Sequence, residues 1–289
     1  METRVAVCGI YGKTGALLAK KMVEGGKFTV SCGIERPGHP NLGADFGRFL
    51  GRDDLHIPVF DLEAFGRMMK KDPVDVVVDF TSAPASVLTV GLCAREGVQV
   101  VMGTTGFTPQ QQEDLAGIVR QSGISMVMSS NYGIAANVMF KVVSVAAKVL
   151  GNRGFDVEIM DYHTRTKPDS PSGTAMTLGR LVSDALGWDL RKVGKYGREL
   201  RNDHPVRPRE EIGFHSLRSG CVENDGSPGI YLAENTVYFG GAWDRLDIAI
   251  HDFGMEAIVP GVMAAVGFLG QNRAKGRIFS MLEVLGLEP

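Results

Sequence analysis

The hydrophobic pattern of the first 130 residues alternates between short apolar runs and longer amphipathic stretches. The apolar runs have the length of strands and lie at Val5–Gly9, Phe28–Glu35, Val74–Phe80, Val98–Met102 and Ile124–Ser129. The stretches between them have helical periodicity and lie at Ala16–Glu24, Leu62–Lys70, Pro84–Glu96 and Pro109–Gln121. Runs rich in β-branched residues on both faces are typical of buried parallel strands. The alternation therefore predicts an α/β fold with a doubly wound parallel sheet of the Rossmann type.

The pattern changes after Asn131. We expect a long apolar helix at Ala135–Leu150, a strand at Phe155–Met160 and a helix at Met176–Leu186. Residues 192–210 are rich in Gly, Arg and Pro and predict a surface loop. Three antiparallel strands are expected next, at Ile212–Arg218, Ile230–Phe239 and Leu246–His251, and then a helix at Val259–Leu269 and a short terminal helix.

These elements predict two domains. The first, up to Asn131, is the α/β domain with the parallel sheet, and the second, from residue 132 on, is an α+β domain with an open mixed sheet.

Composition narrows the classes of function. The chain has 289 residues, 44% hydrophobic and 22% charged, with a net charge of −2. This balance gives no reason to expect a nucleic-acid or membrane partner. The four cysteines lie far apart without metal-ligand spacing, so we expect reduced thiols, no metal site and a cytoplasmic protein. Neither a signal peptide nor an apolar run long enough to span a bilayer is expected.

A glycine-rich turn follows the first strand and opens the first helix. Its spacing, Gly9-x-x-Gly12-x-x-Gly15, is a variant of the dinucleotide fingerprint, and Glu35 lies twenty residues beyond it. Glu35 suits the ribose hydroxyls of NAD, whereas Arg36 suits the 2′-phosphate of NADP. The alternatives are a purely structural turn and a solvated Arg36.

Small polar residues follow two later strands, at Asp79–Thr81 and Gly103–Gly106. The carboxyl edge of a parallel sheet is where ligands bind, so these residues could line a nicotinamide pocket. Ordinary helix capping by Thr81 is the alternative interpretation.

The richest stretch runs from Asp161 to Ala175. It places His163 and Lys167 just before Ser172-Gly173-Thr174, which precede a predicted helix. Helix N-terminal amides favour an anion, Lys167 adds a charge, and a histidine can exchange a proton near neutral pH. The stretch predicts a site that binds and protonates a carboxylate-bearing substrate. A structural histidine and a solvated lysine are the alternatives.

Together these motifs resemble the 4-hydroxy-tetrahydrodipicolinate reductase (dihydrodipicolinate reductase) family over nearly the whole chain. Lys167-x-Asp169-x-Pro171-Ser172-Gly173-Thr174-Ala175 is the most specific of them, and Ile212–Gly220 and His251 continue the match. The resemblance implies NADH- or NADPH-dependent reduction of a cyclic imine dicarboxylate in diaminopimelate and lysine biosynthesis, by a protein that is commonly a homotetramer. It also implies a dinucleotide-binding domain over residues 1–131, completed by residues 256–289, and a substrate-binding and oligomerisation domain over residues 132–255.

The resemblance also assigns residues. His163 is the implied proton donor, and Lys167 the implied catalytic and substrate-binding cation. The other implied substrate residues are Thr105, Ser172, Gly173 and Thr174. The implied cofactor residues are Gly9, Tyr11, Gly12, Lys13, Thr14, Gly15, Glu35, Arg36, Thr81, Gly103, Thr105 and Asn131.

Several positions depart from the family pattern. Thr164 stands where a second histidine is usual, Lys13 where an arginine is usual, and Glu256 near the place of another arginine. The segment 222–233 is longer than usual, and Val259-Pro260-Gly261-Val262 replaces a Phe-Ala-containing motif. Two alternatives therefore stay open: a paralogous imine reductase or amino-acid dehydrogenase with another substrate, and an NAD(P)-binding regulatory protein without turnover.

Overall fold

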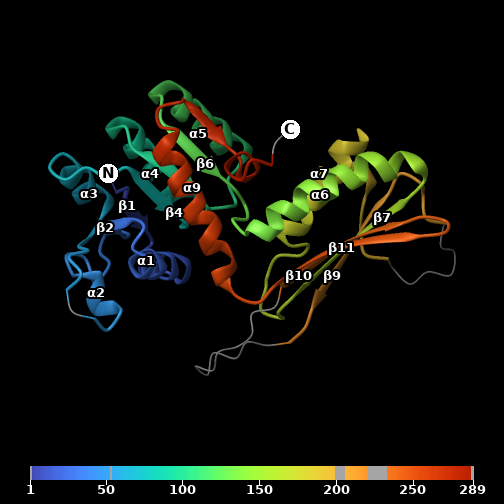
Figure 1. Cartoon of the computed structure of the whole chain (residues 1–289), viewed down its shortest axis with the longest axis horizontal. Helices are drawn as coiled ribbons and strands as arrows, with labels where there is room; N and C mark the ends of the chain where they lie inside the picture. The colour runs from blue at the N-terminus through green and yellow to red at the C-terminus, as the bar shows by residue number, and fades with distance from the viewer. Residues whose placement is uncertain (1, 53, 199–205, 221–232, 288–289) are drawn as a thin grey trace. The chain divides into compact units, whose positions relative to one another are not determined.

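The structure, a computed structural model, describes residues 2–52, 54–198, 206–220 and 233–287. The chain divides into two compact units (Figure 1). Unit 1 comprises Met1–Tyr132 and Ile258–Pro289, and unit 2 comprises Gly133–Ala257. The C-terminal segment thus returns to the unit in which the chain begins.

Unit 1 is built on a seven-stranded, wholly parallel sheet. Its order is β12-β6-β5-β4-β1-β2-β3, the doubly wound arrangement that the sequence predicts. The strands are β1 (Arg4–Cys8), β2 (Thr29–Ile34), β3 (Val59–Phe60), β4 (Val76–Asp79), β5 (Gln99–Met102), β6 (Ser125–Met128) and β12 (Arg277–Phe279). Because β12 pairs with β6, the returning segment completes the sheet.

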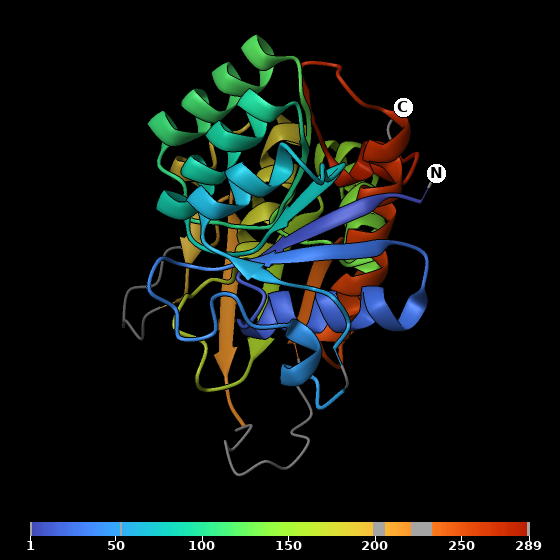
Figure 2. The ribbon, with the colours of Figure 1, turned by 90° about the vertical axis from the view of Figure 1, so that its left-hand side faces the viewer.

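Helices cover both faces of this sheet (Figure 2). On one face lie α1 (Lys13–Gly25) and α9 (Val259–Gln271), and on the other lie α3 (Leu62–Met69), α4 (Ala83–Glu96) and α5 (Pro109–Ser122). Two short helices, α2 (Phe46–Phe49) and α10 (Met281–Val284), complete the unit.

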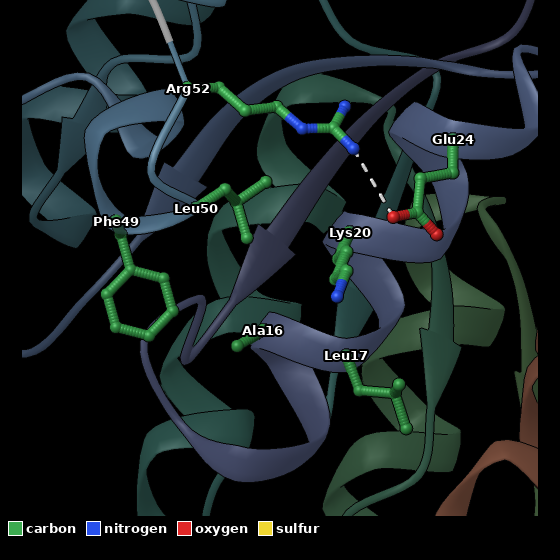
Figure 3. Close-up of a pocket in the computed structure, with 7 residues that line it drawn as sticks. All are labelled: Ala16, Leu17, Lys20, Glu24, Phe49, Leu50 and Arg52. Carbon is green, nitrogen blue, oxygen red and sulfur yellow. Dashed lines mark hydrogen bonds and ion pairs between the residues drawn. The ribbon is translucent and has the colours of Figure 1, made fainter.

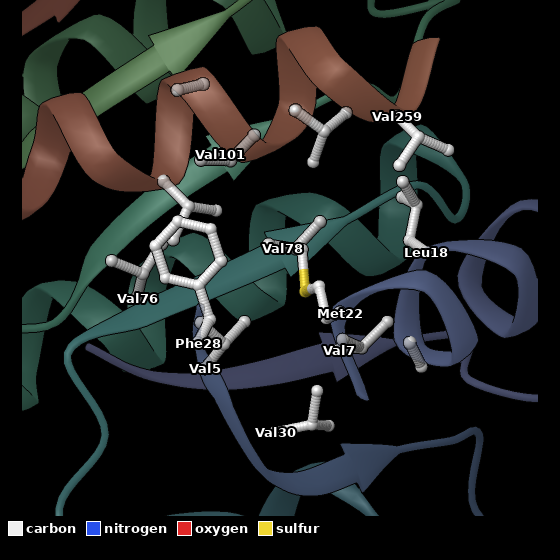
Figure 4. Close-up of a cluster of buried hydrophobic side chains, with 14 of the residues drawn as sticks. Val5, Val7, Leu18, Met22, Phe28, Val30, Val76, Val78, Val101 and Val259 are labelled. Atoms are coloured by element: carbon white, nitrogen blue, oxygen red, sulfur yellow. The ribbon is translucent and has the colours of Figure 1, made fainter. Parts of the chain in front are cut away.

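The strand alternation decides which side chains meet which helices. Val5 and Val7 of β1 pack with Leu18 and Met22 of α1 and with α9 (Figure 4). Their neighbours Ala6 and Cys8 face the cluster formed by α3, α4 and α5. Both faces of β1 are therefore buried, as its continuous apolar run predicts.

Unit 2 is a mixed sheet of order β11-β10-β7-β9-β8 with two long helices on one face. Its strands are β7 (Asp156–His163), β8 (Gly194–Tyr196), β9 (Ile212–Arg218), β10 (Ala233–Gly240) and β11 (Arg245–Asp252). The helices are α6 (Ile134–Leu150), α7 (Gly173–Leu186) and the short α8 (Leu190–Val193), with 3₁₀ turns η1 (Gly151–Arg153) and η2 (Met255–Ile258). The core includes Phe140 and Val143 from α6 and Leu178 from α7, packed on Ile159 and Val237.

Two expectations for unit 2 were wrong. β9 is not antiparallel to its neighbours, because it pairs in parallel with both β7 and β8. The physical reason is the crossover through α7, which returns the chain in its original direction. Residues 192–210 are not wholly loop, since they contain β8. Residues 199–205 and most of the long 222–233 segment lie outside the described residues.

The expectation that no apolar run is long enough to span a bilayer was also wrong, as judged by length and composition. Within the described ranges, Ile134–Arg153 forms a helix of mean hydropathy 1.6 that is long enough to cross a bilayer. Its buried side chains, Met139, Phe140 and Val143 among them, belong to the core of unit 2. Packing of this kind is expected of a core helix.

Candidate cofactor and substrate sites

The glycine turn of unit 1 is as tight as its spacing predicts. Gly9 has a φ of +65°, its amide donates to the carbonyl of Ile34 at 2.7 Å, and its own carbonyl accepts from Gly12 at 2.8 Å. A Cβ at Gly15 would collide with the Gly9 carbonyl oxygen. No side chain caps α1, whose N-cap is Gly12. The first amides of this helix can therefore meet an anion such as a pyrophosphate.

A hollow of about 390 Å³ opens beside this turn. It is lined by Gly9, Tyr11, Gly12, Lys13, Thr14, Gly15, Glu35, Arg36, His39, Phe80 and Thr81. Glu35 stands at the end of β2, where its Oε1 accepts from the Tyr11 amide at 3.0 Å. A pyrophosphate on α1 with a ribose beside Glu35 is the arrangement that such a turn supports. The residues present fit a dinucleotide.

Three predicted cofactor residues lie outside the set that lines this hollow. Gly103 follows β5, where a Cβ would collide with the Phe80 ring. Thr105 is exposed in the loop that follows. The Asn131 carbonyl accepts the Ser129 hydroxyl at 2.7 Å, just after β6.

A buried carboxylate joins the ends of β4 and β5. Asp79 is fully buried, and its Oδ1 accepts both the amide (3.0 Å) and the hydroxyl (2.6 Å) of Thr81. The Thr104 hydroxyl lies 3.3 Å from the same oxygen and accepts from Ser86 at 2.9 Å. Burial raises the pKa of Asp79 above its usual value. This network fixes Thr81, and sequence reasoning did not anticipate Thr104 or Ser86 in it.

In unit 2 another buried acid, Asp161, organises the stretch that the sequence singled out. Asp161 is 1% exposed. Its Oδ2 accepts from the Ser172 amide at 3.0 Å and from the Arg218 guanidinium at 2.9 Å, and its Oδ1 accepts from the Ser216 hydroxyl at 2.5 Å. One carboxylate therefore joins β7, β9 and the start of α7.

Ser172 is the N-cap of α7, which begins at Gly173, before the start at Met176 that the sequence predicts. Its hydroxyl accepts from the Ala175 amide at 3.2 Å. Gly173 and Thr174 form the first turn of the helix. Because Asp161 holds the Ser172 amide, the position of this helix end is fixed from the sheet below.

The loop between β7 and α7 is held by two cations. The Arg218 guanidinium donates to the Asp169 carbonyl at 2.7 Å. The Lys167 ammonium lies 2.9 Å from the Asp169 carboxylate. Lys167 is therefore positioned by its neighbour within the same loop.

His163 ends β7 on the same face as Asp161. It is 5% exposed, neither ring nitrogen has a hydrogen-bond partner among the described residues, and Nε2 lies 3.8 Å from Asp161 Oδ2. Burial, assisted by the positive charge of Lys167, lowers the pKa of His163 to about 4. In this state His163 is neutral at pH 7, instead of exchanging a proton there as expected, because a buried imidazolium is poorly solvated.

Asp161, Ser216 and Arg218 were missed as functional residues. One signal was available, since Asp161 lies two residues before His163 and a strand places such residues on one face. Ser216 and Arg218 come from β9, and their approach follows from its pairing with β7.

Three of the positions that depart from the family pattern are exposed or half-buried, whereas Val259, Gly261 and Val262 are buried in unit 1. Glu256 is exposed in η2. Thr164 is half-buried, and its hydroxyl lies 3.1 Å from that of Thr166. Lys13 begins α1 and lines the hollow.

Cysteines and metal ligands add no further site. Cys8, Cys32 and Cys93 are buried free thiols, and burial raises the pKa of Cys32 to about 12. Cys221 lies outside the described residues. In the part of the chain that the structure describes, no three His, Cys, Asp or Glu side chains gather in a group that could hold a metal ion.

Comparison with known proteins covers both units. Residues 3–132 match the family model "Dihydrodipicolinate reductase, N-terminus", and residues 135–285 match the corresponding C-terminal model. A 4-hydroxy-tetrahydrodipicolinate reductase from Methanocaldococcus jannaschii is 34% identical over 284 residues, which is 98% of this chain and 97% of the relative. The enzyme of that name from Citrifermentans bemidjiense is 34% identical over 285 residues, covering 98% and 99%.

Solved structures agree on the fold. A dipicolinate-bound dihydrodipicolinate reductase from Paenisporosarcina sp. TG-14 superposes with a TM-score of 0.73 at 24% identity, covering 98% of this chain and 99% of that one. A DAP dehydrogenase from C. glutamicum, in complex with DAP, gives a TM-score of 0.55 at 13% identity, covering 100% and 96%.

Proposed function

The chain belongs to the dihydrodipicolinate reductase family, and we propose that it catalyses the NAD(P)H-dependent reduction of 4-hydroxy-tetrahydrodipicolinate to tetrahydrodipicolinate in diaminopimelate and lysine biosynthesis. The reaction adds one hydride and one proton and releases the 4-hydroxyl group as water. The observation that carries the proposal is the Asp161 network, which fixes an anion-ready helix start beside His163 and Lys167.

Substrate binding is the first task of this site. One carboxylate of the substrate meets the N-terminus of α7 at Ser172, Gly173 and Thr174. The amides and dipole of a helix start stabilise such a charge. Lys167 adds a cation whose present partner, Asp169, is half exposed, so a substrate carboxylate can compete for it.

Proton delivery is the second task. A dianionic substrate near His163 offsets the positive charges of Lys167 and Arg218 that now help to lower the pKa of the imidazole. Its pKa rises on binding, because a nearby negative charge favours the protonated form. His163 thus becomes a proton donor in the complex, whereas in the free protein it is neutral.

Cofactor binding is the task of unit 1. The bound nicotinamide supplies the hydride, and the protein supplies position and electrostatics. The glycine turn with Lys13 and Thr14 holds the pyrophosphate, and Glu35 and Arg36 hold the adenosine ribose. Thr81, fixed by Asp79, lies at the nicotinamide side together with Gly103 and Thr105, and Asn131 follows the next strand.

A cytoplasmic homotetramer completes the proposal. The alternation of β7 and β10 directs Ile159 and Val237 into the core of unit 2, so Met160 and Tyr238 lie on the opposite face of the sheet. Among the described residues, the helices of unit 2 pack on the core face, so the opposite face is open to the association that the family resemblance implies. Light scattering should give four times the chain mass of 31.2 kDa; a monomeric mass would contradict this part.

The test of the activity is NADPH oxidation with freshly generated 4-hydroxy-tetrahydrodipicolinate. Turnover to tetrahydrodipicolinate is the expected result. Turnover only with a different imine would instead indicate a paralogue with a changed substrate. Tight NADPH binding without any turnover would indicate a regulatory protein.

A further inference from the structure

A histidine that is not among the predicted cofactor residues lines the cofactor hollow. His39 lies in the turn after β2, where its amide donates to the Arg36 carbonyl at 3.2 Å. Its imidazole stacks on the Tyr11 ring, with centroids 5.0 Å apart and planes only 6° from parallel. The turn that carries Arg36 is thereby packed against the glycine turn.

The segment that follows His39 in the chain, residues 40–52, is anchored at several points. Asp45 accepts hydrogen bonds from three amides, those of Gly47, Leu55 and Ile57. Phe46 and Phe49 of α2 pack on Tyr11, with ring centroids 5.7 and 5.1 Å from its own.

A second hollow separates this segment from α1. Figure 3 shows its lining, with Arg52 reaching across to Glu24 of α1 at 3.3 Å. Phe49 lines this hollow as well as contacting Tyr11. Both ends of the segment are therefore fixed to the glycine turn or its helix, which keeps His39 in place.

The hydrogen bonding of His39 defines what it can offer a ligand. Its Nδ1 accepts from the Asn41 amide at 3.3 Å. The proton of the neutral ring is therefore on Nε2, which is a donor in both charge states of the imidazole. A phosphate group needs such donors.

We propose that His39 is a specificity-determining residue that, with Arg36, binds the 2′-phosphate of NADPH. The inference rests on the proposed function only in taking NAD(P)H as the cofactor. Both residues line one hollow with Glu35, the residue at the ribose position. The Glu35 carboxylate repels a 2′-phosphate and suits the hydroxyls of NADH, whereas Arg36 and the His39 donor favour the phosphate.

Binding of matched ligands by calorimetry tests this role without requiring turnover. NADP⁺ and NAD⁺ form one pair, and 2′,5′-ADP and 5′-AMP form another, each differing by the 2′-phosphate alone. H39F keeps an aromatic ring on Tyr11 but removes the nitrogens. We expect it to weaken NADP⁺ and 2′,5′-ADP roughly 10- to 150-fold, as for loss of a charge-assisted hydrogen bond, and to change NAD⁺ and 5′-AMP less than twofold. H39Q, which restores a donor, should recover part of the loss.

Two outcomes decide against the role of His39. Equal loss of affinity for both members of a pair in H39F would show that His39 only shapes the turn. An unchanged ratio of the NADP⁺ and NAD⁺ dissociation constants in both variants would show that His39 does not bind the phosphate. Wild-type protein that binds neither dinucleotide would overturn the proposed function itself. Melting curves show whether H39F or H39Q has a folding defect. If H39F has one, the affinities of H39Q for the two ligand pairs decide whether His39 binds the phosphate.

Discussion

The carboxylate of Asp161 and the guanidinium of Arg218 lie 2.9 Å apart in the interior of unit 2, with side-chain exposures of 1% and 17%. His163 pairs in register with Arg218 across β7 and β9. The ion pair therefore lies next to the proposed proton donor in the sheet. It also holds the Ser172 amide and the Asp169 carbonyl, so the part of the β7–α7 loop that leads into α7 depends on it.

Replacing Asp161 by Asn should be costly. The change leaves Arg218 without its charged partner, and breaking a buried ion pair typically costs about 3–5 kcal/mol. Urea unfolding should show that loss of stability, and kcat/KM should fall because Ser172 and Lys167 lose their support. D247N, which breaks an exposed pair with Arg245, is the matched control and should change both little. A D161N protein with wild-type kcat/KM would refute the positioning role.

Replacing Lys167 by Met should weaken binding of the dicarboxylate. Loss of one charge-assisted contact corresponds to about 1.5–3 kcal/mol, or roughly 10- to 150-fold in Kd. Calorimetry with pyridine-2,6-dicarboxylate measures this effect, and NADPH affinity should stay the same. K148M removes an exposed lysine from α6 and serves as the control. Equal dicarboxylate affinity in K167M and K148M would show that Lys167 does not contact the substrate.

The stability of the protein should depend on pH through His163. Its folded-state pKa of about 4 is below the ordinary value of 6.5. Between these values the unfolded state binds more protons, so stability is complete above about pH 6.5 and is lost as pH falls toward 4. The slope approaches about 1.4 kcal/mol per pH unit for one proton. H163Q should lose this slope in denaturant titrations from pH 4 to 7, whereas H251Q, at an exposed position, should keep it.

Replacing Arg36 by Ala should shift cofactor preference. NADPH should lose about 1–3 kcal/mol more binding energy than NADH, because only NADPH offers a phosphate to the guanidinium. Fluorescence titration of both cofactors measures the difference, with R67A on α3 as a control of equal charge. If R36A loses the same binding energy for NADH as for NADPH, Arg36 does not contact the 2′-phosphate.

Local signals in the sequence made the fold of unit 1 predictable. The run Val5–Gly9 and the glycine spacing after it encode β1, the turn and α1 between Arg4 and Gly25. The short elements were missed, since β3 and α2 have two and four residues and show no periodicity.

The framework of the substrate site was less predictable. Asp161 meets Arg218 across 57 positions of sequence, a contact that only the parallel pairing of β7 and β9 creates. The lowered pKa of His163 depends on the same burial. Sequence reasoning identified the Asp161–Ala175 stretch, but it assigned no role to the Asp161 carboxylate that organises it.

The central claim is that His163, which pairs in register with Arg218, protonates the substrate. The kcat of H163Q for NADPH oxidation with 4-hydroxy-tetrahydrodipicolinate tests it most directly, with the Kd for NADPH measured on the same sample. The account predicts a kcat lowered by about 10²–10⁴-fold, as for loss of a general acid, and an unchanged Kd. A kcat equal to that of the wild type would contradict it.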